Sequence, residues 1–261
     1  MARWRFFMQT YNFLFKSYRD NINTIDGIIE ASESLNQEIE NTDLSGLSSF
    51  NKTFIIILKN IKKKALSGAF IEFSQIEYFF VRSADYYFYS LKNYVTGLKC
   101  SRPWKIFFDK CKKSTSPSFI NLILGMNAHI NSDYIYTLND VHKDGSFLTD
   151  YEKVNDIISE SINEIVLQTA DKDIIENDYS KKTNISYSLF FNIIVKRWRA
   201  EAWKNYLNYK KKLIGEKDIE SSAENTAMNI CHITHFSNLW EVLKLPKIKI
   251  FNNSIRSSQV S

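Results

Sequence analysis

The sequence predicts an all-α protein, a single-domain bundle of about seven to nine helices that spans residues 1–261 around one central helix. Two observations favour this fold class. The chain has only seven glycines and three prolines among 261 residues, too few for the many tight turns of sandwiches, propellers or glycine-rich nucleotide-binding folds. Apolar residues also recur at steps of three and four along most segments, which is the period of a helix face.

The first half of the chain is expected to hold an aromatic arm and three helices. Residues 1–20 are predicted to form an N-terminal arm or short helix packed on the body. A helix is predicted to begin near Thr24. The five apolar residues 54–58 are predicted to lie in a buried helix, because no partner strand is found nearby. Residues 71–95 form the most aromatic predicted helix, and Gly97 is placed to end it.

The second half is expected to hold four further helices, each with a recognisable start or stop. Proline is tolerated in a first helical turn, and glycine is favoured just after a last one. The expected elements are a helix opened by Arg102-Pro103-Trp104, a helix from Ser116-Pro117 to about Leu138, a loop over 139–146, a helix over 151–169 capped by Thr149-Asp150, a helix over 185–214 ended by Gly215, and a loosely packed tail over 245–261.

Charge and cysteine content exclude several classes of protein. The net charge is only +5 and the basic residues are spread along the chain, so we expect no nucleic-acid partner. Three cysteines without a Cys-x-x-Cys pair favour reduced thiols. No stretch is apolar enough to span a membrane and no signal peptide is recognisable, so a cytoplasmic location is expected. The expected partner is a small-molecule substrate, and a homodimer is left open.

The most informative segment is the predicted central helix. His129 and Asp133 are four residues apart, which places both side chains on one helix face. Two chemistries suit such a pair. The carboxylate can orient the imidazole for acid–base catalysis, or both groups can bind one metal ion. Asn127 and Asn131 are candidates for orienting a substrate, and Gly125 lets another backbone or a ligand approach closely.

A His four residues from an Asp is common by chance, and a local side-chain pair is the simpler interpretation. The surrounding helix is strongly apolar, however, and polar groups in a buried helix must find partners. The cluster therefore predicts a polar cavity inside the domain. Arg199 is expected to pair with Asp133 or Asp150. The candidate substrate-binding residues are Phe80, Tyr87, Tyr94, Met126, Arg199 and Trp203.

The central segment also resembles a known family. Gly125-Met126-Asn127-Ala128-His129-Ile130-Asn131-x-Asp133 is similar to the signature of the uncharacterised, mainly bacterial family called domain of unknown function 5995. The resemblance implies a helical domain with an active or binding site around His129 and Asp133, and it brings no established reaction. It extends over roughly residues 70–215 through weaker matches at Pro103-Trp104, Phe107-Phe108-Asp109, Asp150-Tyr151, Val154-Asn155-Asp156 and Arg199-x-x-Ala202-Trp203.

The same segment faintly resembles the His-x-x-x-Asp helices of zinc-dependent phospholipases C and related nucleases. Those enzymes need more histidine and aspartate ligands than this chain, with four histidines, can supply. A single divalent metal is the remaining metal hypothesis, held by His129 and Asp133 with Asp150 or His142 as a third ligand. The favoured hypothesis needs no cofactor.

Three functions are consistent with the sequence. The first is an enzyme that acts on a small, largely apolar or aromatic molecule by His/Asp acid–base chemistry, either in hydrolysis or in a proton-transfer-driven cyclisation or isomerisation. In this hypothesis His129 is the acid or base and Asp133 orients it. The second is a hydrolase that uses one metal ion at the same helix. The third is a non-enzymatic helical module that binds a ligand or another protein.

Overall fold

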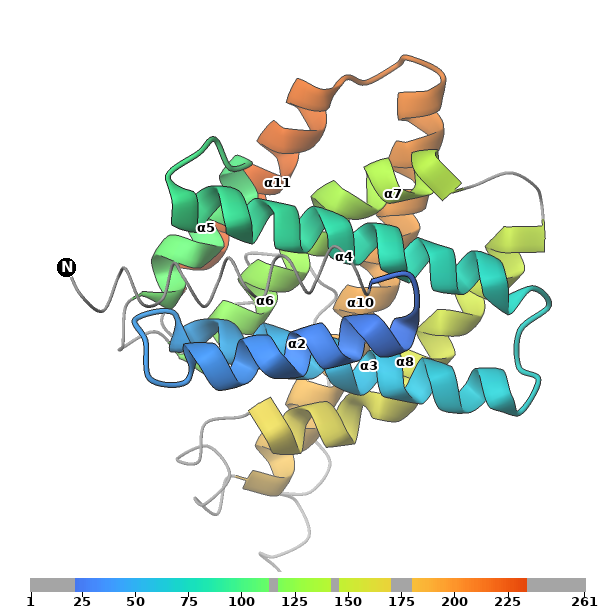
Figure 1. The fold of residues 1–261 in the computed structure, drawn as a ribbon, viewed down its shortest axis with the longest axis horizontal. Coiled ribbons are helices and arrows are strands. Elements are labelled where there is room, and N and C mark those ends of the chain that lie inside the picture. Colours follow the sequence, from blue (N-terminus) through green and yellow to red (C-terminus); the bar gives the residue numbers. More distant parts are fainter. Residues whose placement is uncertain (1–21, 113–116, 142–145, 170–179, 234–261) are drawn as a thin grey trace, which may run out of the picture.

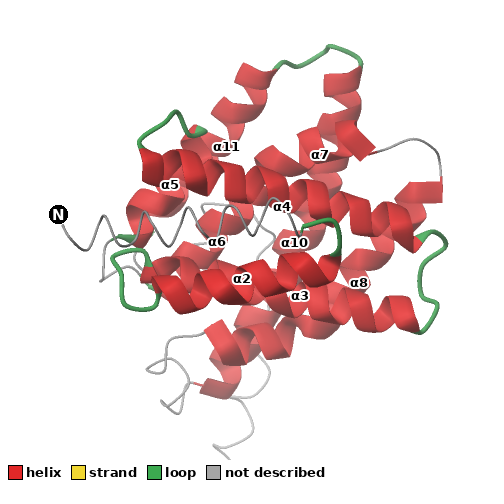
Figure 2. Ribbon diagram, viewed as in Figure 1, coloured by secondary structure: helices red, strands yellow, loops and turns green. Residues whose placement is uncertain are grey.

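The computed structural model describes residues 22–112, 117–141, 146–169 and 180–233. Within these ranges all regular structure is helical and no strand occurs, which confirms the all-α prediction (Figure 2). None of the helices in these ranges has the length and apolar character that crossing a bilayer requires. The predicted N-terminal arm and C-terminal tail lie outside the described residues.

Three helices run across the front of the molecule in Figure 1. Helix α2 (Ile25–Ile39) packs against both α3 (Ser48–Leu66) and α4 (Phe73–Thr96). The hydroxyl of Thr24 caps α2 by accepting a hydrogen bond from the amide of Gly27 at 3.2 Å. Gly97 ends α4 with a φ of 74°, the left-handed conformation that glycine adopts without strain. The predicted cap at Thr24 and the predicted stop at Gly97 are therefore confirmed.

A continuous helical rod lies behind this layer and forms the centre of the fold. It consists of α6 (Ser118–Ala128), the π-helical turn η2 (His129–Asp133) and α7 (Tyr134–Val141). Every residue from 119 to 128 is buried, because the rod packs against α3, α5 (Arg102–Cys111), α10 (Ser180–Lys210) and α11 (Glu216–Cys231). The prediction that the His-x-x-x-Asp helix is central is confirmed.

Two helices in the second half differ from the prediction in their bounds. Helix α8 (Ser146–Thr169) begins before the expected Thr149-Asp150 cap, so these residues lie inside its first turns. Helix α10 covers Ser180–Lys210 instead of 185–214, and Gly215 does not end it. Gly215 is the N-cap residue of α11, and its amide donates to the carboxylate of Asp218 at 2.8 Å. Helix α11 is absent from the predicted elements because its few apolar residues are widely spaced in a polar sequence.

Candidate functional site

The π-helical turn decides which side chains of the central rod share a face. The amide of Tyr134 donates to the carbonyl of His129, a bond five residues back instead of the four of an α-helix. In an α-helix two residues five apart face different directions, whereas the wider turn brings them onto one side. The rings of His129 and Tyr134 are in edge contact, with centroids 4.9 Å apart.

A buried chain of hydrogen bonds holds the imidazole of His129. Its Nδ1 lies 3.4 Å from Oδ2 of Asp133, and the same oxygen accepts a hydrogen bond of 2.9 Å from Nε1 of Trp104 on α5. His129 and Asp133 are 3% and 4% exposed. An ionised carboxylate only accepts hydrogen bonds, so Nδ1 of His129 must carry the proton that faces it. The other ring nitrogen, Nε2, is then free to accept a proton.

Burial controls the ionisation of Asp133. Loss of hydration raises the pKa of this carboxyl above its ordinary value, and the hydrogen bonds from His129 and Trp104 oppose the rise. An indole N–H can only donate, so Trp104 stabilises the ionised form specifically. The hydrogen bond from Trp104 helps to keep Asp133 ionised inside an aromatic core. The ionised carboxylate in turn holds His129 in the Nδ1–H tautomer.

Aromatic rings surround His129 on the side of α3. Phe50 and Phe54 meet its ring edge-on, with centroids 5.6 Å and 5.2 Å away. Phe50 can come this close because Gly125, one turn before His129, has no side chain: a Cβ there would lie 2.7 Å from the Phe50 ring. The close approach predicted at Gly125 is therefore made by a side chain of α3 and not by a backbone or a ligand.

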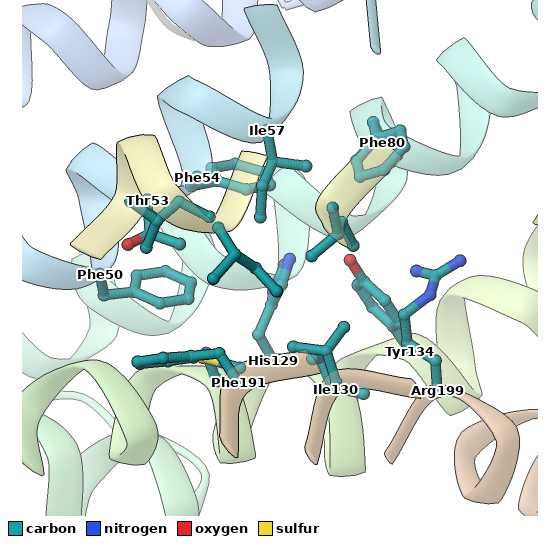
Figure 3. A pocket seen from close by; sticks show the side chains of 15 residues that line it. Phe50, Thr53, Phe54, Ile57, Phe80, His129, Ile130, Tyr134, Phe191 and Arg199 are labelled. Carbon is teal, nitrogen blue, oxygen red and sulfur yellow. The ribbon is translucent and has the colours of Figure 1, made fainter. Parts of the chain in front are cut away.

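A small cavity opens beside the imidazole (Figure 3). Its volume is about 40 Å³, which is room for about three water molecules. The polar groups of His129, Tyr134 and Arg199 point toward the side of the cavity formed by Ile57 and Phe80. Ile57 is the one lining residue that is not fully buried, so the cavity comes nearest to solvent there. The remaining lining residues are Phe50, Thr53, Phe54, Met126, Ile130, Ile158, Ile162, Ile165, Phe191 and Val195.

Nε2 of His129 has no hydrogen-bond partner in the structure, although it is buried. Buried polar atoms are nearly always hydrogen-bonded, and an exception calls for an explanation. The cavity provides one, because a ligand or water inside it would lie beside this nitrogen. The structure thus combines an oriented imidazole, an open ring nitrogen and an enclosed apolar space.

The predicted substrate-binding residues divide into two groups. Phe80, Met126 and Arg199 line the cavity. Tyr87, although fully buried, packs instead behind Phe50, with ring centroids 5.2 Å apart. The two other predicted residues also lie outside the cavity lining: Tyr94 donates to Asp109 at 2.7 Å, and Trp203 packs on Phe147 and Tyr151.

Asn127 and Asn131 hold helices together instead of facing the cavity. Nδ2 of Asn127 donates to the carbonyl of Ala223 on α11 at 2.8 Å, and its Oδ1 accepts from Asn131 at 2.9 Å. Neither residue is among those that line the cavity. On a helix, residues two positions from His129 point away from it, and this direction explains why neither amide lines the cavity.

The predicted metal ligands do not come together. Both carboxylate oxygens of Asp150 accept backbone hydrogen bonds, from Ile71 at 2.9 Å and from Glu72 at 2.8 Å, where the chain enters α4. His142 lies outside the described residues. Within the described ranges, no three His, Cys, Asp or Glu side chains are grouped closely enough to hold a metal ion.

Arg199 does not form the expected ion pair with Asp133 or Asp150. Its Nε donates to Oδ1 of Asn155 and its Nη2 to the carbonyl of Tyr151, both at 2.6 Å. The two aspartates are already engaged by other donors, as described above. The guanidinium carbon instead lies 3.9 Å from the centre of the Tyr151 ring.

Sequence reasoning missed several residues that shape the site, among them Trp104 and Tyr134. Trp104 and Tyr134 both contact His129, yet neither is a predicted site residue. A signal for Trp104 existed, since a buried carboxylate at Asp133 requires donors, and Pro103-Trp104 belongs to the family resemblance. Tyr134 carried no signal, because helical spacing directs it away from His129 until the π turn is known.

The fold and the site define an all-α protein with a buried His–Asp pair beside a small internal cavity. Comparison with known families identifies the same family that the signature of the central helix resembles. The chain matches the model of the family of unknown function DUF5995 over residues 25–233, and it belongs to that family. No curated protein and no solved structure matches the chain.

Proposed function

We propose that this protein is an enzyme that performs acid–base chemistry on a small, largely apolar molecule held in the cavity. The observation that carries the proposal is the unpartnered Nε2 of His129, which lies beside the cavity while Nδ1 is held by Asp133. A general base needs this arrangement: one ring nitrogen oriented, the other open toward the substrate.

The roles of the residues follow from their positions. Nε2 of His129 accepts a proton from the substrate or from a water beside it, and the imidazolium later returns that proton. Asp133 is a positioning residue that fixes the tautomer and stabilises the imidazolium. Burial raises the pKa of Tyr134, so its hydroxyl stays protonated and can donate a hydrogen bond to an oxygen that gains negative charge.

The test compares variants at two histidines. His129→Gln removes the base, whereas His232→Gln changes an exposed histidine at the end of α11 and serves as the matched control. We expect a panel of small esters and carbonyl compounds to contain a substrate for the wild type and for His232→Gln, with turnover lost in His129→Gln. General bases contribute roughly 10²–10⁴-fold. Equal turnover by all three proteins would refute the proposal.

The single-metal hydrolase and the non-enzymatic module are the other outcomes of the same experiment. Metal-dependent hydrolysis requires a transition metal in stoichiometric amount in protein purified without a histidine tag, and elemental analysis measures it. A folded protein that binds small apolar molecules but turns none of them over would instead be a binding module. We favour neither, because the engaged oxygens of Asp150 remove one candidate metal ligand, and a carboxylate that orients an imidazole is the arrangement of a general base.

A further inference from the structure

Arg199 is a fully buried cation without a counter-charge. Its side chain has no accessible surface, and no carboxylate of the described residues lies within ion-pair distance of it. Arginine is not deprotonated in proteins, so the charge persists wherever the side chain is placed. An isolated buried charge is costly, and burial of arginine is rare unless the side chain is paired.

The groups around the guanidinium are neutral. An amide oxygen of Asn155, the carbonyl of Tyr151 and the face of the Tyr151 ring stabilise the cation through dipoles and a cation–π contact. The remaining nitrogen, Nη1, has no hydrogen-bond partner. The guanidinium therefore retains a nitrogen with two unused N–H groups and one unbalanced positive charge.

This unused charge borders the cavity. Arg199 lines it together with His129, the other residue of the lining with an orphaned buried nitrogen. The rest of the lining is almost entirely hydrocarbon, from Ile158, Ile162 and Val195 among others. A cavity with one cationic end and apolar walls is complementary to a molecule that has one anionic end and an apolar body.

We propose that the cavity binds a small carboxylic acid as its anion, with the carboxylate against Arg199 and the apolar part among the isoleucines of α8. This inference rests on the proposed function, because it assigns a class of substrate to the same cavity. A phosphate monoester suits the cavity less well. It carries up to two negative charges, whereas Arg199 supplies one positive charge, and the volume of about 40 Å³ favours a compact headgroup.

The position of Tyr134 separates binding from chemistry. Its ring contacts His129 on one side, at 4.9 Å between centroids, and the guanidinium carbon of Arg199 on the other, at 5.5 Å. A carboxylate held by Arg199 therefore does not occupy the place beside Nε2 of His129. Arg199 is expected to affect substrate binding, and His129 the rate of the chemical step.

The test uses acid and amide pairs of the same shape. Formate is compared with formamide, and acetate with acetamide, by titration calorimetry on the full chain at constant ionic strength. We expect each carboxylate to bind roughly tenfold to a hundredfold more tightly than its amide, the ratio that a charge-assisted hydrogen bond supplies. Equal affinity of acid and amide for the wild type would overturn the inference without any variant.

Two variants of α10 localise the effect. Arg199→Met removes the buried charge, and Arg197→Met removes the same charge two residues away, where Arg197 pairs with Glu201 at 2.9 Å on the surface. We expect the preference for carboxylates to disappear in Arg199→Met and to persist in Arg197→Met. Should Arg199→Met fail to fold, Arg199→Lys keeps the charge and must keep the preference. Loss of preference in Arg197→Met alone would overturn the assignment.

The outcomes distinguish this inference from the proposed function. Carboxylates that bind through Arg199, without turnover of any compound, would leave the binding inference standing and remove the catalytic proposal. Turnover of neutral compounds that depends on His129, together with equal binding of acids and amides, would leave the catalytic proposal standing and remove the binding inference.

Discussion

Replacing Asp133 by Asn tests how His129 is oriented, without the need to know a substrate. The carboxylate accepts hydrogen bonds from Trp104 and from His129 through one oxygen. An Asn side chain keeps the bond from the indole only if its oxygen takes the position of Oδ2, and this position also faces the imidazole, so the N–H group lies at the position of Oδ1. Nδ1 of His129 therefore keeps its proton, and Nε2 stays unprotonated. The variant is expected to keep the tautomer of His129 but to remove the negative charge that stabilises the imidazolium.

The expected changes in stability and turnover of Asp133→Asn follow from the same contacts. Hydrogen bonds to a charged group are worth roughly 1.5–3 kcal/mol and neutral ones about 0.5–1.5 kcal/mol, so both retained bonds become weaker. The cost of burying a charge disappears at the same time. We expect the free energy of unfolding to change by less than about 2 kcal/mol, whereas turnover falls by roughly tenfold, because the imidazolium loses the difference between a charged and a neutral hydrogen bond.

The pH dependence of stability has a definite sign. Burial raises the pKa of Asp133 above its ordinary value of 3.8, so the folded protein holds this proton more tightly than the unfolded chain. The resulting stabilisation is complete below pH 3.8 and is lost as the pH rises through the raised pKa. The stability of the wild type relative to Asp133→Asn is therefore expected to fall as the pH rises through this interval.

Nitrogen-15 NMR of the imidazole rings measures the tautomer of His129, and urea denaturation over a pH series measures the stability. Trp104→Phe is the matched control, since it removes the other hydrogen bond to Asp133 while leaving the carboxylate to hold Nδ1–H. The reasoning is refuted if Nε2 of His129 becomes protonated in Asp133→Asn at neutral pH. It is also refuted if Nε2 is already protonated in the wild type at that pH.

Two further changes probe the frame around the site. Gly125→Ala places a Cβ 2.7 Å from the Phe50 ring. Overpacking of this kind is expected to lower the free energy of unfolding by about 1–3 kcal/mol, which a urea titration measures. An unchanged midpoint of unfolding would contradict this expectation, because it would show that Phe50 moves freely. Asp150→Ala removes the acceptor for two amides before α4, so thermal melting is expected to report a loss of about 1–2 kcal/mol, with the tautomer of His129 unaltered. A changed tautomer would instead connect Asp150 to the site.

Local signals in the sequence were sufficient for most helices. Thr24 as a cap, Gly97 as a stop and Pro103 in a first turn act within one turn of the backbone, so their effect can be read without the rest of the fold. The central position of the helix with His129 could be predicted for a similar reason, because its apolar residues surround it on all sides and only burial can accommodate them.

The candidate site was predictable only in part. Helical spacing brought His129 and Asp133 together correctly, since both belong to one turn. The same reasoning placed Asn127 and Asn131 with the substrate, whereas they bind each other and Asn127 also binds α11. A spacing rule states which residues share a face, but the partner of that face comes from another part of the chain.

The sequence by itself determined the helical class, the main caps and the His–Asp pair, because each depends on residues within a few positions of one another. Only the tertiary structure decided that a π turn directs Tyr134 toward His129, that Trp104 holds the carboxylate, and that Arg199 borders the cavity without a counter-charge. These features depend on helices that are distant in sequence and meet in the core, and their energies come from burial, which no local pattern of residues specifies.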